Sequence, residues 1–299
     1  MNYSQLKDNI KGTVILDAPM KKYTTWKIGG NADCLVLPAD AADVVAAQAF
    51  CREHQVSCRV IGNGSNLLVL DGGVEGVVIR IGEGMNGYTV DGTLVTAGSG
   101  CVLARLARET AKLGLAGLEW AVGIPASIGG AAYMNAGAYG HCFYETLEAV
   151  EAIDSNGNIC NLSVEELTYS YRHTRLMEEG YIVTKAMIRL KEGDAASLTA
   201  AADETMHLRR EKQPLEYPSA GSTFKRPEGY YAGELIMKAG MRGFTVGGAQ
   251  VSEKHCGFVI NTGTAASADI IEVIEKVQES VKNTFGVQLE PEVILLGER

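Results

Sequence analysis

The stretch GLEWAVGIPASIGGAAYMNAGAYG, residues 117–140, has the most unusual composition in the chain and gives the first indication of its fold. It is dense in glycine and nearly free of charge, with Ser127, Asn135 and Tyr139 as polar side chains. Because glycine loses more conformational entropy on folding than any other residue, this density predicts that a flat or bulky group approaches the main chain. A flavin or a nucleotide fits such a surface better than a metal ion does. A tightly packed, glycine-rich crossing within the core is the alternative.

A second glycine-containing stretch, RVIGNGSNLLVLDGG (residues 59–73), contains a short strand that opens into a loop of small residues. The loop consists of Gly62, Asn63, Gly64, Ser65 and Asn66. Small residues directly after a strand allow main-chain N–H groups to converge on a phosphate. Leu67 occupies the place of the third glycine in the dinucleotide fingerprint, and an apolar run follows where that motif requires a helix. A Rossmann fold is therefore excluded, whereas a pyrophosphate loop of another architecture and a plain turn both remain open.

Length and composition indicate an ordinary globular protein of two or three domains, with 299 residues of which 46% are hydrophobic and 21% charged. The formal net charge of -9 argues against general nucleic-acid binding, which depends on basic surface. Since no apolar run has the length of a signal peptide or a membrane span, we expect a cytoplasmic protein without membrane contacts. The seven cysteines show neither a CxxC pair nor Cys/His metal spacing, which predicts free thiols and no metal site.

Local patterns predict several regular elements. Asp40 can cap a helix over the residues that follow it. The pair Asp91-Gly92 lies between two strand-like segments, as in a β-hairpin. A helix is expected over residues 102–113, and another after Ser267, a plausible N-cap, where apolar residues recur with helical spacing.

The stretch YPSAGSTFKRP, residues 217–227, contains the hydroxyl of Ser222 close to the cations Lys225 and Arg226. Standing alone, a Gly-Ser pair in a polar segment is usually an ordinary turn. Basic residues outnumber acidic ones over residues 205–254, although the whole chain is acidic. This local excess suits a polyanionic small molecule, and a solvated surface would have a similar composition.

Two further residues become candidates for the functional site only when they are considered together with these motifs. Arg172 follows two tyrosines in YSYRHTRL (residues 169–176), where a fixed guanidinium could hold a carboxylate or a phosphate. Glu292 lies in the strand-like segment LEPEVILLGER, residues 289–299. Taken singly, each residue is more simply explained as an ordinary exposed side chain without a function.

Seven motifs follow one another over nearly the whole chain: TTWKIGGNAD, IGNGSNLL, GIPASIGGAAYMNAGAYG, YSYRHT, PSAGSTFKRP, KHCGFVIN and LEPEV. Taken in this order, they resemble the UDP-N-acetylenolpyruvoylglucosamine reductase family. The resemblance implies an α+β fold, with a two-subdomain FAD-binding region of the vanillyl-alcohol-oxidase (PCMH) type and a C-terminal α+β substrate-binding domain. We expect these parts at residues 1–84, 85–198 and 199–299, with the last strand returning towards the FAD region.

The same resemblance implies the reaction: NADPH supplies hydride to a non-covalently bound FAD, and the enolpyruvyl group of a UDP-sugar is reduced in peptidoglycan precursor synthesis. It implies catalytic roles for Ser222 as proton donor, for Arg172 and for Glu292. The implied substrate contacts are Lys212, Tyr171, Lys225 and Arg226. The implied cofactor contacts are the loop of residues 62–66 together with Gly123, Ile124, Pro125, Ser127, Gly129, Gly130, Asn135 and Gly137.

The chain departs from the family pattern in two places. Arg226 stands where many members have asparagine, and the short interval from Arg172 to Ser222 resembles the subfamily without an inserted tyrosine loop. Two other functions remain open: an alcohol or sugar oxidase of the same flavin fold, and a non-catalytic protein that binds a nucleotide-sugar. We expect the reductase to be a monomer.

Overall fold

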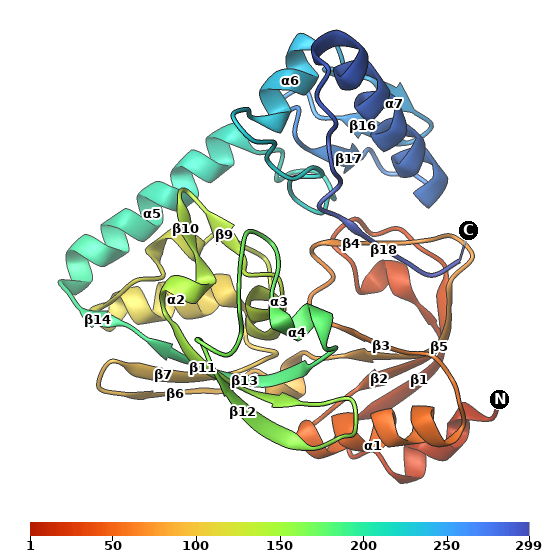
Figure 1. Cartoon of the computed structure of the whole chain (residues 1–299), viewed down its shortest axis with the longest axis vertical. Coiled ribbons are helices and arrows are strands. Elements are labelled where there is room, and N and C mark those ends of the chain that lie inside the picture. The colour runs from red at the N-terminus through yellow and green to blue at the C-terminus, as the bar shows by residue number, and fades with distance from the viewer. Residues whose placement is uncertain (299) are drawn as a thin grey trace. The chain divides into compact units, whose positions relative to one another are not determined.

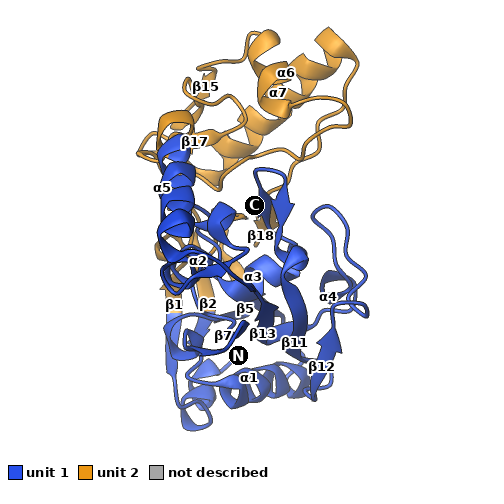
Figure 2. Ribbon diagram, turned by 90° about the vertical axis from the view of Figure 1, so that its left-hand side faces the viewer, with its two compact units in different colours: residues 1–16, 34–63, 76–209 blue, residues 17–33, 64–75, 210–299 orange. Residues whose placement is uncertain are grey.

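The computed structural model describes residues 1–298 and consists of two compact units, which Figure 2 shows in different colours. Unit 1 comprises Met1–Leu16, Cys34–Asn63 and Gly76–Arg209. Unit 2 comprises Asp17–Asp33, Gly64–Glu75 and Arg210–Arg299. The chain therefore passes between the units several times. The three predicted domains are a different and finer division, and their boundaries stay predictions.

A four-stranded sheet and one helix form the N-terminal part of the fold (Figure 1). The strand order is β1 (Thr13–Pro19), β2 (Asn31–Leu37), β5 (Val74–Arg80) and β3 (Cys58–Ile61). Helix α1 (Ala41–Glu53) begins where predicted, because the Asp40 carboxylate accepts a hydrogen bond from the Asp43 main-chain N–H. Apolar side chains of α1, β2 and β5 share one core, which includes Val36, Val44 and Ile79.

A five-stranded antiparallel sheet forms the second part of unit 1. Its order is β12 (Ile159–Ser163), β11 (Leu147–Ile153), β13 (Ile182–Arg189), β7 (Leu94–Gly98) and β6 (Tyr88–Asp91). Asp91 pairs with Leu94, which confirms the hairpin predicted at Asp91-Gly92. Helices α2 (Leu103–Lys112) and α3 (Ile128–Tyr133) contribute side chains to the core of this part, and α2 confirms the helix predicted over residues 102–113.

Shorter elements complete unit 1. They are the strand pairs β8 (Leu115–Ala116) with β14 (Lys191–Glu192) and β9 (Gly137–Ala138) with β10 (His141–Cys142), and the helix α4 (Arg175–Glu178). The long helix α5 (Ala195–Lys212) follows β14, and the division between the units falls near its C-terminal end.

Unit 2 contains two small sheets and two helices. The elements are β4 (Leu67–Val69), α6 (Ala232–Lys238), β15 (Thr245–Val246), β16 (Ala249–Val251), β17 (Val259–Asn261), α7 (Ser267–Phe285) and β18 (Ile294–Leu296). Strand β4 directly follows the loop of residues 62–66, so the predicted absence of a Rossmann helix at that position is confirmed. The final strand, β18, pairs in parallel with β4.

Helix α7 is amphipathic, as its sequence predicts, but the prediction that Ser267 is its N-cap is wrong by one residue. The cap is Ala266, whose main-chain N–H donates to the Asp269 carboxylate at 3.0 Å. The Ser267 hydroxyl donates to Asp71 at 2.8 Å, and the Ser267 main-chain N–H donates to the same carboxylate. Ser267 therefore joins α7 to the turn after β4 instead of capping the helix.

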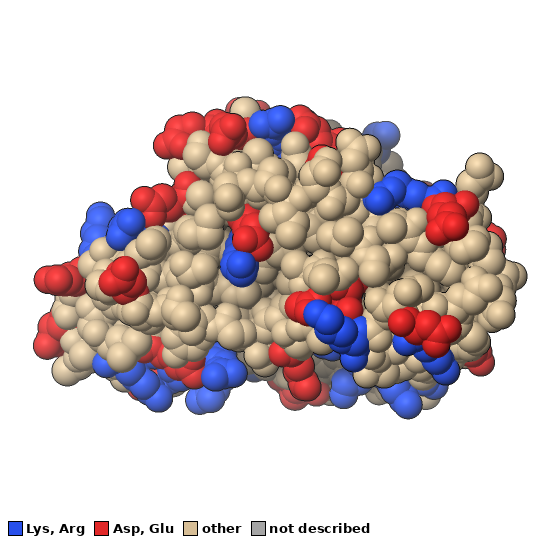
Figure 3. Space-filling model, turned by 90° about the horizontal axis from the view of Figure 1, so that it is seen from below, with Lys and Arg blue, Asp and Glu red and all other residues tan. Residues whose placement is uncertain are grey.

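The surface seen in Figure 3 mixes acidic and basic side chains with a larger uncharged area. Within residues 1–298, none of the helices combines the length and the apolar composition that crossing a membrane requires. All seven cysteines are free thiols.

The core of unit 2 encloses Trp26, which is fully buried although it comes from the N-terminal part of the sequence. Its indole N–H donates to the Val259 carbonyl at 3.0 Å, and its own carbonyl accepts from the Asn261 side chain at 3.0 Å. This buried side chain and its hydrogen bonds attach the segment Asp17–Asp33 to the core of unit 2.

Replacing Trp26 by alanine should destabilise unit 2 by about 3–5 kcal/mol, since the substitution leaves a large cavity and an unpaired carbonyl. Urea unfolding followed by far-UV circular dichroism measures this change. Tyr230→Ala is the control, because that side chain is 49% exposed in the same unit and its loss should change the free energy of unfolding by less than about 0.5 kcal/mol. Equal effects of the two substitutions would contradict the assignment of Trp26 to this core.

Candidate active site

Ser222 lies on a segment without regular secondary structure that is held on both sides by hydrogen bonds within unit 2. On one side, the main-chain N–H of Thr223 donates to Gly257 and the Thr223 hydroxyl accepts from the N–H of Val259. On the other side, the Thr223 carbonyl accepts from the N–H of Glu292 at 2.8 Å. Thr223 is fully buried and Ser222 is exposed. The segment therefore presents the serine hydroxyl to solvent on a fixed support.

The same hydrogen bonds bring Glu292 beside this segment, so two of the three predicted catalytic residues are neighbours in space. The Glu292 N–H donates to Thr223, and its carbonyl accepts from the side-chain amide of Asn66 at 3.1 Å. Phe224 and Pro291 form an isolated antiparallel bridge in the same region. Asn66, a predicted cofactor contact, thus has a structural role towards Glu292 that the sequence did not indicate.

Lys225 and Arg226 continue the segment away from Ser222. The Lys225 main-chain N–H donates to the Glu290 carbonyl at 2.8 Å, and its ammonium lies 3.3 Å from the Glu290 carboxylate. The Arg226 guanidinium lies over the ring of Tyr231, 4.1 Å from its centroid. Lys212, the last residue of α5, is exposed in the same unit. These three cations are the basic groups that the sequence assigned to substrate.

Residues Gly62 and Asn63 of unit 1 lie against the stretch of residues 125–130. The Asn63 side-chain amide donates to the Pro125 carbonyl at 3.0 Å. A Cβ atom added to Gly62 would collide with the hydroxyl of Ser127, which itself accepts a hydrogen bond from the Gly130 N–H. The two predicted cofactor stretches therefore form one continuous surface of main chain and small side chains. The main-chain N–H groups of Ile128, Gly129 and Gly130 already donate within the protein, to Cys101, Ser99 and Ser127 respectively. That this surface holds a pyrophosphate stays a prediction.

The remaining residues of the 62–66 loop belong to unit 2. A Cβ on Gly64, which has φ +61°, would collide with the Tyr23 carbonyl, so this position requires glycine for two reasons. Ser65 is half-buried next to it. The contacts of these two residues with a cofactor stay predictions.

Arg209 is a residue that the sequence analysis missed. A Cβ on Gly123 would collide with the Arg209 side chain, whose guanidinium lies close to this predicted cofactor position. Burial lowers the pKa of Arg209. Arg209 and Lys212 lie on the same helix, α5. The nearness of Arg209 to the predicted substrate lysine in the sequence is the signal that could have identified it.

Arg172, the third predicted catalytic residue, lies in unit 1 in a loop that packs on residues 133–144. The Arg172 guanidinium donates through Nη1 to the Asn135 carbonyl at 3.1 Å and through Nη2 to the Gly137 carbonyl at 3.0 Å. The Thr174 hydroxyl donates to the Tyr133 carbonyl at 2.8 Å. The structure thus joins the predicted active-site arginine to the predicted cofactor stretch.

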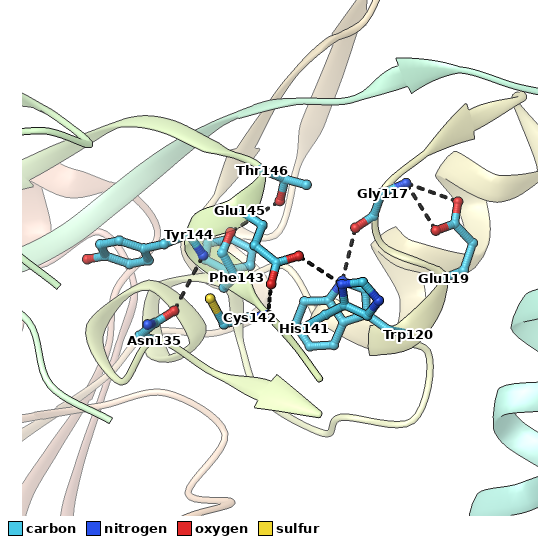
Figure 4. A network of polar contacts seen from close by, with 10 residues as sticks. All are labelled: Gly117, Glu119, Trp120, Asn135, His141, Cys142, Phe143, Tyr144, Glu145 and Thr146. Atoms are coloured by element: carbon cyan, nitrogen blue, oxygen red, sulfur yellow. Dashed lines mark hydrogen bonds and ion pairs between the residues drawn. The ribbon is translucent and has the colours of Figure 1, made fainter. Parts of the chain in front are cut away.

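Aromatic side chains extend the contact between these two segments. The rings of Tyr144 and Tyr169 lie 4.3 Å apart between centroids, and burial raises the pKa of Tyr144. Tyr171, a predicted substrate contact, is 54% exposed, and its ring centroid lies 4.9 Å from the Arg172 guanidinium carbon. Figure 4 shows the neighbouring network, in which the Asn135 side chain points towards the main chain of Tyr144.

We expect Gly62→Ala to lower the flavin content of the purified protein and to destabilise unit 1, because the new methyl group collides with the Ser127 hydroxyl. Ser127→Ala alone should cost about 0.5–2 kcal/mol through loss of the cap at α3. The double variant should be more stable than the sum of the single effects predicts, since the methyl group then has room. Gly87→Ala is the control, because a Cβ there has no neighbour within 4 Å. Strict additivity would rule out this contact as the cause.

Two protein families match the chain. Residues 32–163 match the family described as FAD binding domain, and residues 213–296 match the family described as UDP-N-acetylenolpyruvoylglucosamine reductase, C-terminal domain. Together with the mixed helix and strand content, they confirm the predicted α+β fold class, with an FAD-binding domain followed by a C-terminal domain. The vanillyl-alcohol-oxidase type of the FAD-binding region stays a prediction.

Similar proteins extend over nearly the whole chain. A UDP-N-acetylenolpyruvoylglucosamine reductase from Clostridium perfringens is 48% identical over 284 residues, which are 95% of this chain and 93% of that protein. The reductase of the same name from Caldanaerobacter subterraneus is 45% identical over 99% of this chain and 98% of its own. The crystal structure of UDP-N-acetylenolpyruvylglucosamine reductase from Thermus caldophilus superposes with a TM-score of 0.82 at 36% identity, covering 96% and 99% of the two chains. The chain therefore belongs to the UDP-N-acetylenolpyruvoylglucosamine reductase family of FAD-dependent oxidoreductases.

Proposed function

We propose that this protein reduces the enolpyruvyl group of UDP-N-acetylglucosamine enolpyruvate to give UDP-N-acetylmuramate, with NADPH as hydride donor. The reaction belongs to peptidoglycan precursor synthesis, and we propose that the protein acts in the cytoplasm as a monomer. The observation that carries the proposal is the exposed Ser222 hydroxyl, held beside Glu292 on hydrogen-bonded main chain. The 45% to 48% identity with reductases of that name supports it.

The residues of unit 1 that would hold FAD are those of the surface formed by Gly62, Asn63 and residues 125–130. The residues present fit the cofactor, because Gly62, Gly129 and Gly130 are partly exposed and carry no side chain that would keep a pyrophosphate from the main chain. When bound, FAD supplies the hydride that reduces the β-carbon of the enolpyruvyl group.

Ser222 is the proposed proton donor to the α-carbon. A serine hydroxyl is a weak acid, but a carbon that carries developing negative charge is a strong base, so the proton transfer runs downhill. The rigid support from Thr223 keeps the hydroxyl in one place, which is the requirement for general acid catalysis.

Arg172 is the proposed partner of the substrate carboxylate and of the charge that develops beside it. Its guanidinium is permanently charged and is already fixed by carbonyl oxygens, so it needs little reorganisation during the reaction. Glu292 can assist only as a protonated or hydrogen-bonded group, since a bare carboxylate would repel an enolate. We assign substrate contacts to Lys212, Lys225 and Arg226, whose positive charges suit the diphosphate of the UDP group, and to Tyr171.

Ser222→Ala should leave reduction of the flavin by NADPH unchanged and should slow its reoxidation by the enolpyruvyl UDP-sugar by about 10²–10⁴-fold, the usual contribution of a positioned proton donor. Stopped-flow absorbance of the flavin separates the two half-reactions. Ser280→Ala is the control in the same unit, because the Ser280 hydroxyl donates to the Ala239 carbonyl and neither residue has a proposed role in the reaction. Normal reoxidation of the alanine variant would refute the role of Ser222.

Oxygen consumption with an alcohol or sugar, without NADPH, would favour an oxidase instead.

Tyr231→Leu should raise KM for the UDP-sugar by about two- to fivefold with kcat unchanged, because it removes a cation–π contact worth about 0.5–1 kcal/mol from Arg226. Tyr230→Leu is a matched control, since the adjacent tyrosine is also exposed and the substitution keeps its main-chain carbonyl, which accepts a hydrogen bond from Arg226. Initial rates over a range of substrate concentrations give both constants. A change in kcat without a change in KM would count against a binding role at this position.

A further inference from the structure

Asn135 is a buried polar side chain to which the proposed reaction gives no task. Only 4% of the residue is exposed. Its amide Nδ2 donates to the Ser170 carbonyl at 3.1 Å. Its Oδ1 accepts from the main-chain N–H of Tyr144 at 3.4 Å, the bond that Figure 4 shows. Both ends of the amide are therefore engaged with main chain from other segments.

The partner of its Nδ2 is the first residue of the turn that carries Arg172. In this turn, Ser170 and His173 exchange main-chain hydrogen bonds of 2.9 and 3.3 Å. Arg172 has φ 57°, a left-handed conformation that costs free energy for a residue other than glycine. Such a conformation persists only where the surroundings hold it. Asn135 holds one end of the turn through the Ser170 carbonyl.

The restraint is reciprocal, because the Arg172 side chain returns to the main chain of the same stretch. Its guanidinium donates to the carbonyls of Asn135 and Gly137. The side chain of Asn135 thus fixes the main chain of the Arg172 turn, and the side chain of Arg172 fixes the main chain at Asn135. The two residues form a closed pair of contacts between two loops.

We propose that Asn135 is a positioning residue for Arg172, and that its amide sets where the guanidinium meets the substrate carboxylate. This inference rests on the proposed function of Arg172. It differs from the prediction that Asn135 contacts the cofactor, because the described hydrogen bonds of its side chain go to the protein itself.

Two substitutions at Asn135 test the role of its side-chain amide separately from the conformation of the backbone. Asn135 has φ 42°, which glycine and aspartate both tolerate better than alanine does. Asn135→Gly removes the side chain without new strain at φ. Asn135→Asp keeps the size and the acceptor for Tyr144 but cannot donate to Ser170. Asn158→Gly is the control, since that amide donates to Asp154 within an exposed hairpin of the same unit.

Both Asn135 variants should slow reoxidation of the flavin by the enolpyruvyl UDP-sugar by about ten- to a hundredfold, the effect of a misplaced reacting group. Reduction by NADPH and flavin content should stay within about twofold of wild type. In an Arg172→Ala background, Asn135→Gly should add little further loss, because its effect passes through the arginine. Loss of flavin, equal slowing of both half-reactions, or independent losses in the double variant would each overturn the proposal.

Hydrogen exchange of the main-chain amides in residues 168–174 gives a readout that does not depend on activity. Asn135→Gly and Asn135→Asp should both accelerate exchange in this segment, and Asn158→Gly should not. Unchanged exchange would overturn the proposal. If the wild-type protein fails to reduce the enolpyruvyl substrate, the proposed function fails, and the exchange experiment still decides whether Asn135 holds the Arg172 turn.

Discussion

The hydrogen bonds of one fully buried residue, Thr223, organise the candidate site in unit 2. Its N–H, carbonyl and hydroxyl bind Gly257, Glu292 and Val259 respectively. A segment without regular secondary structure can be buried only if its main-chain groups find partners, since an unpaired buried group costs as much as a lost hydrogen bond. The neighbours on both sides of Thr223 supply those partners. As a result, Ser222 is exposed on a rigid support and Glu292 is fixed beside it.

Asparagine side chains provide the same kind of support where no strand is available. Asn66 binds the Glu292 carbonyl, Asn135 binds Ser170 and Tyr144, and Asn261 binds the Trp26 carbonyl. An amide side chain carries both a donor and an acceptor, so it can replace a peptide group from a neighbouring strand. Except for the bond between Asn135 and Tyr144, which are 9 residues apart, these contacts join residues that are 35 to 235 positions apart in the sequence. Specific hydrogen bonds from these asparagine side chains therefore fix parts of both units that have no regular secondary structure.

The sequence predicted the elements whose cause is local. Asp40 caps α1, and Asp91-Gly92 forms a hairpin, because the residues that decide these features are neighbours in the chain. The N-cap at Ser267 was wrong because its hydroxyl binds Asp71, 196 residues away, and no local pattern encodes that partner. The same limit explains why Arg209 was missed and why Asn135 was assigned only to the cofactor. Ser222 and Glu292 could be proposed from their motifs, but their proximity required the structure.

The glycine-rich stretch that indicated a flavin has a second physical explanation. A Cβ on Gly123 would meet Arg209, one on Gly129 would meet Ser99, and one on Gly137 would meet the His141 carbonyl. Protein packed on protein therefore already requires glycine at these positions, as the alternative of a tightly packed crossing predicted. Glycine density alone is thus no specific sign of FAD, and the cofactor assignment depends on the family match.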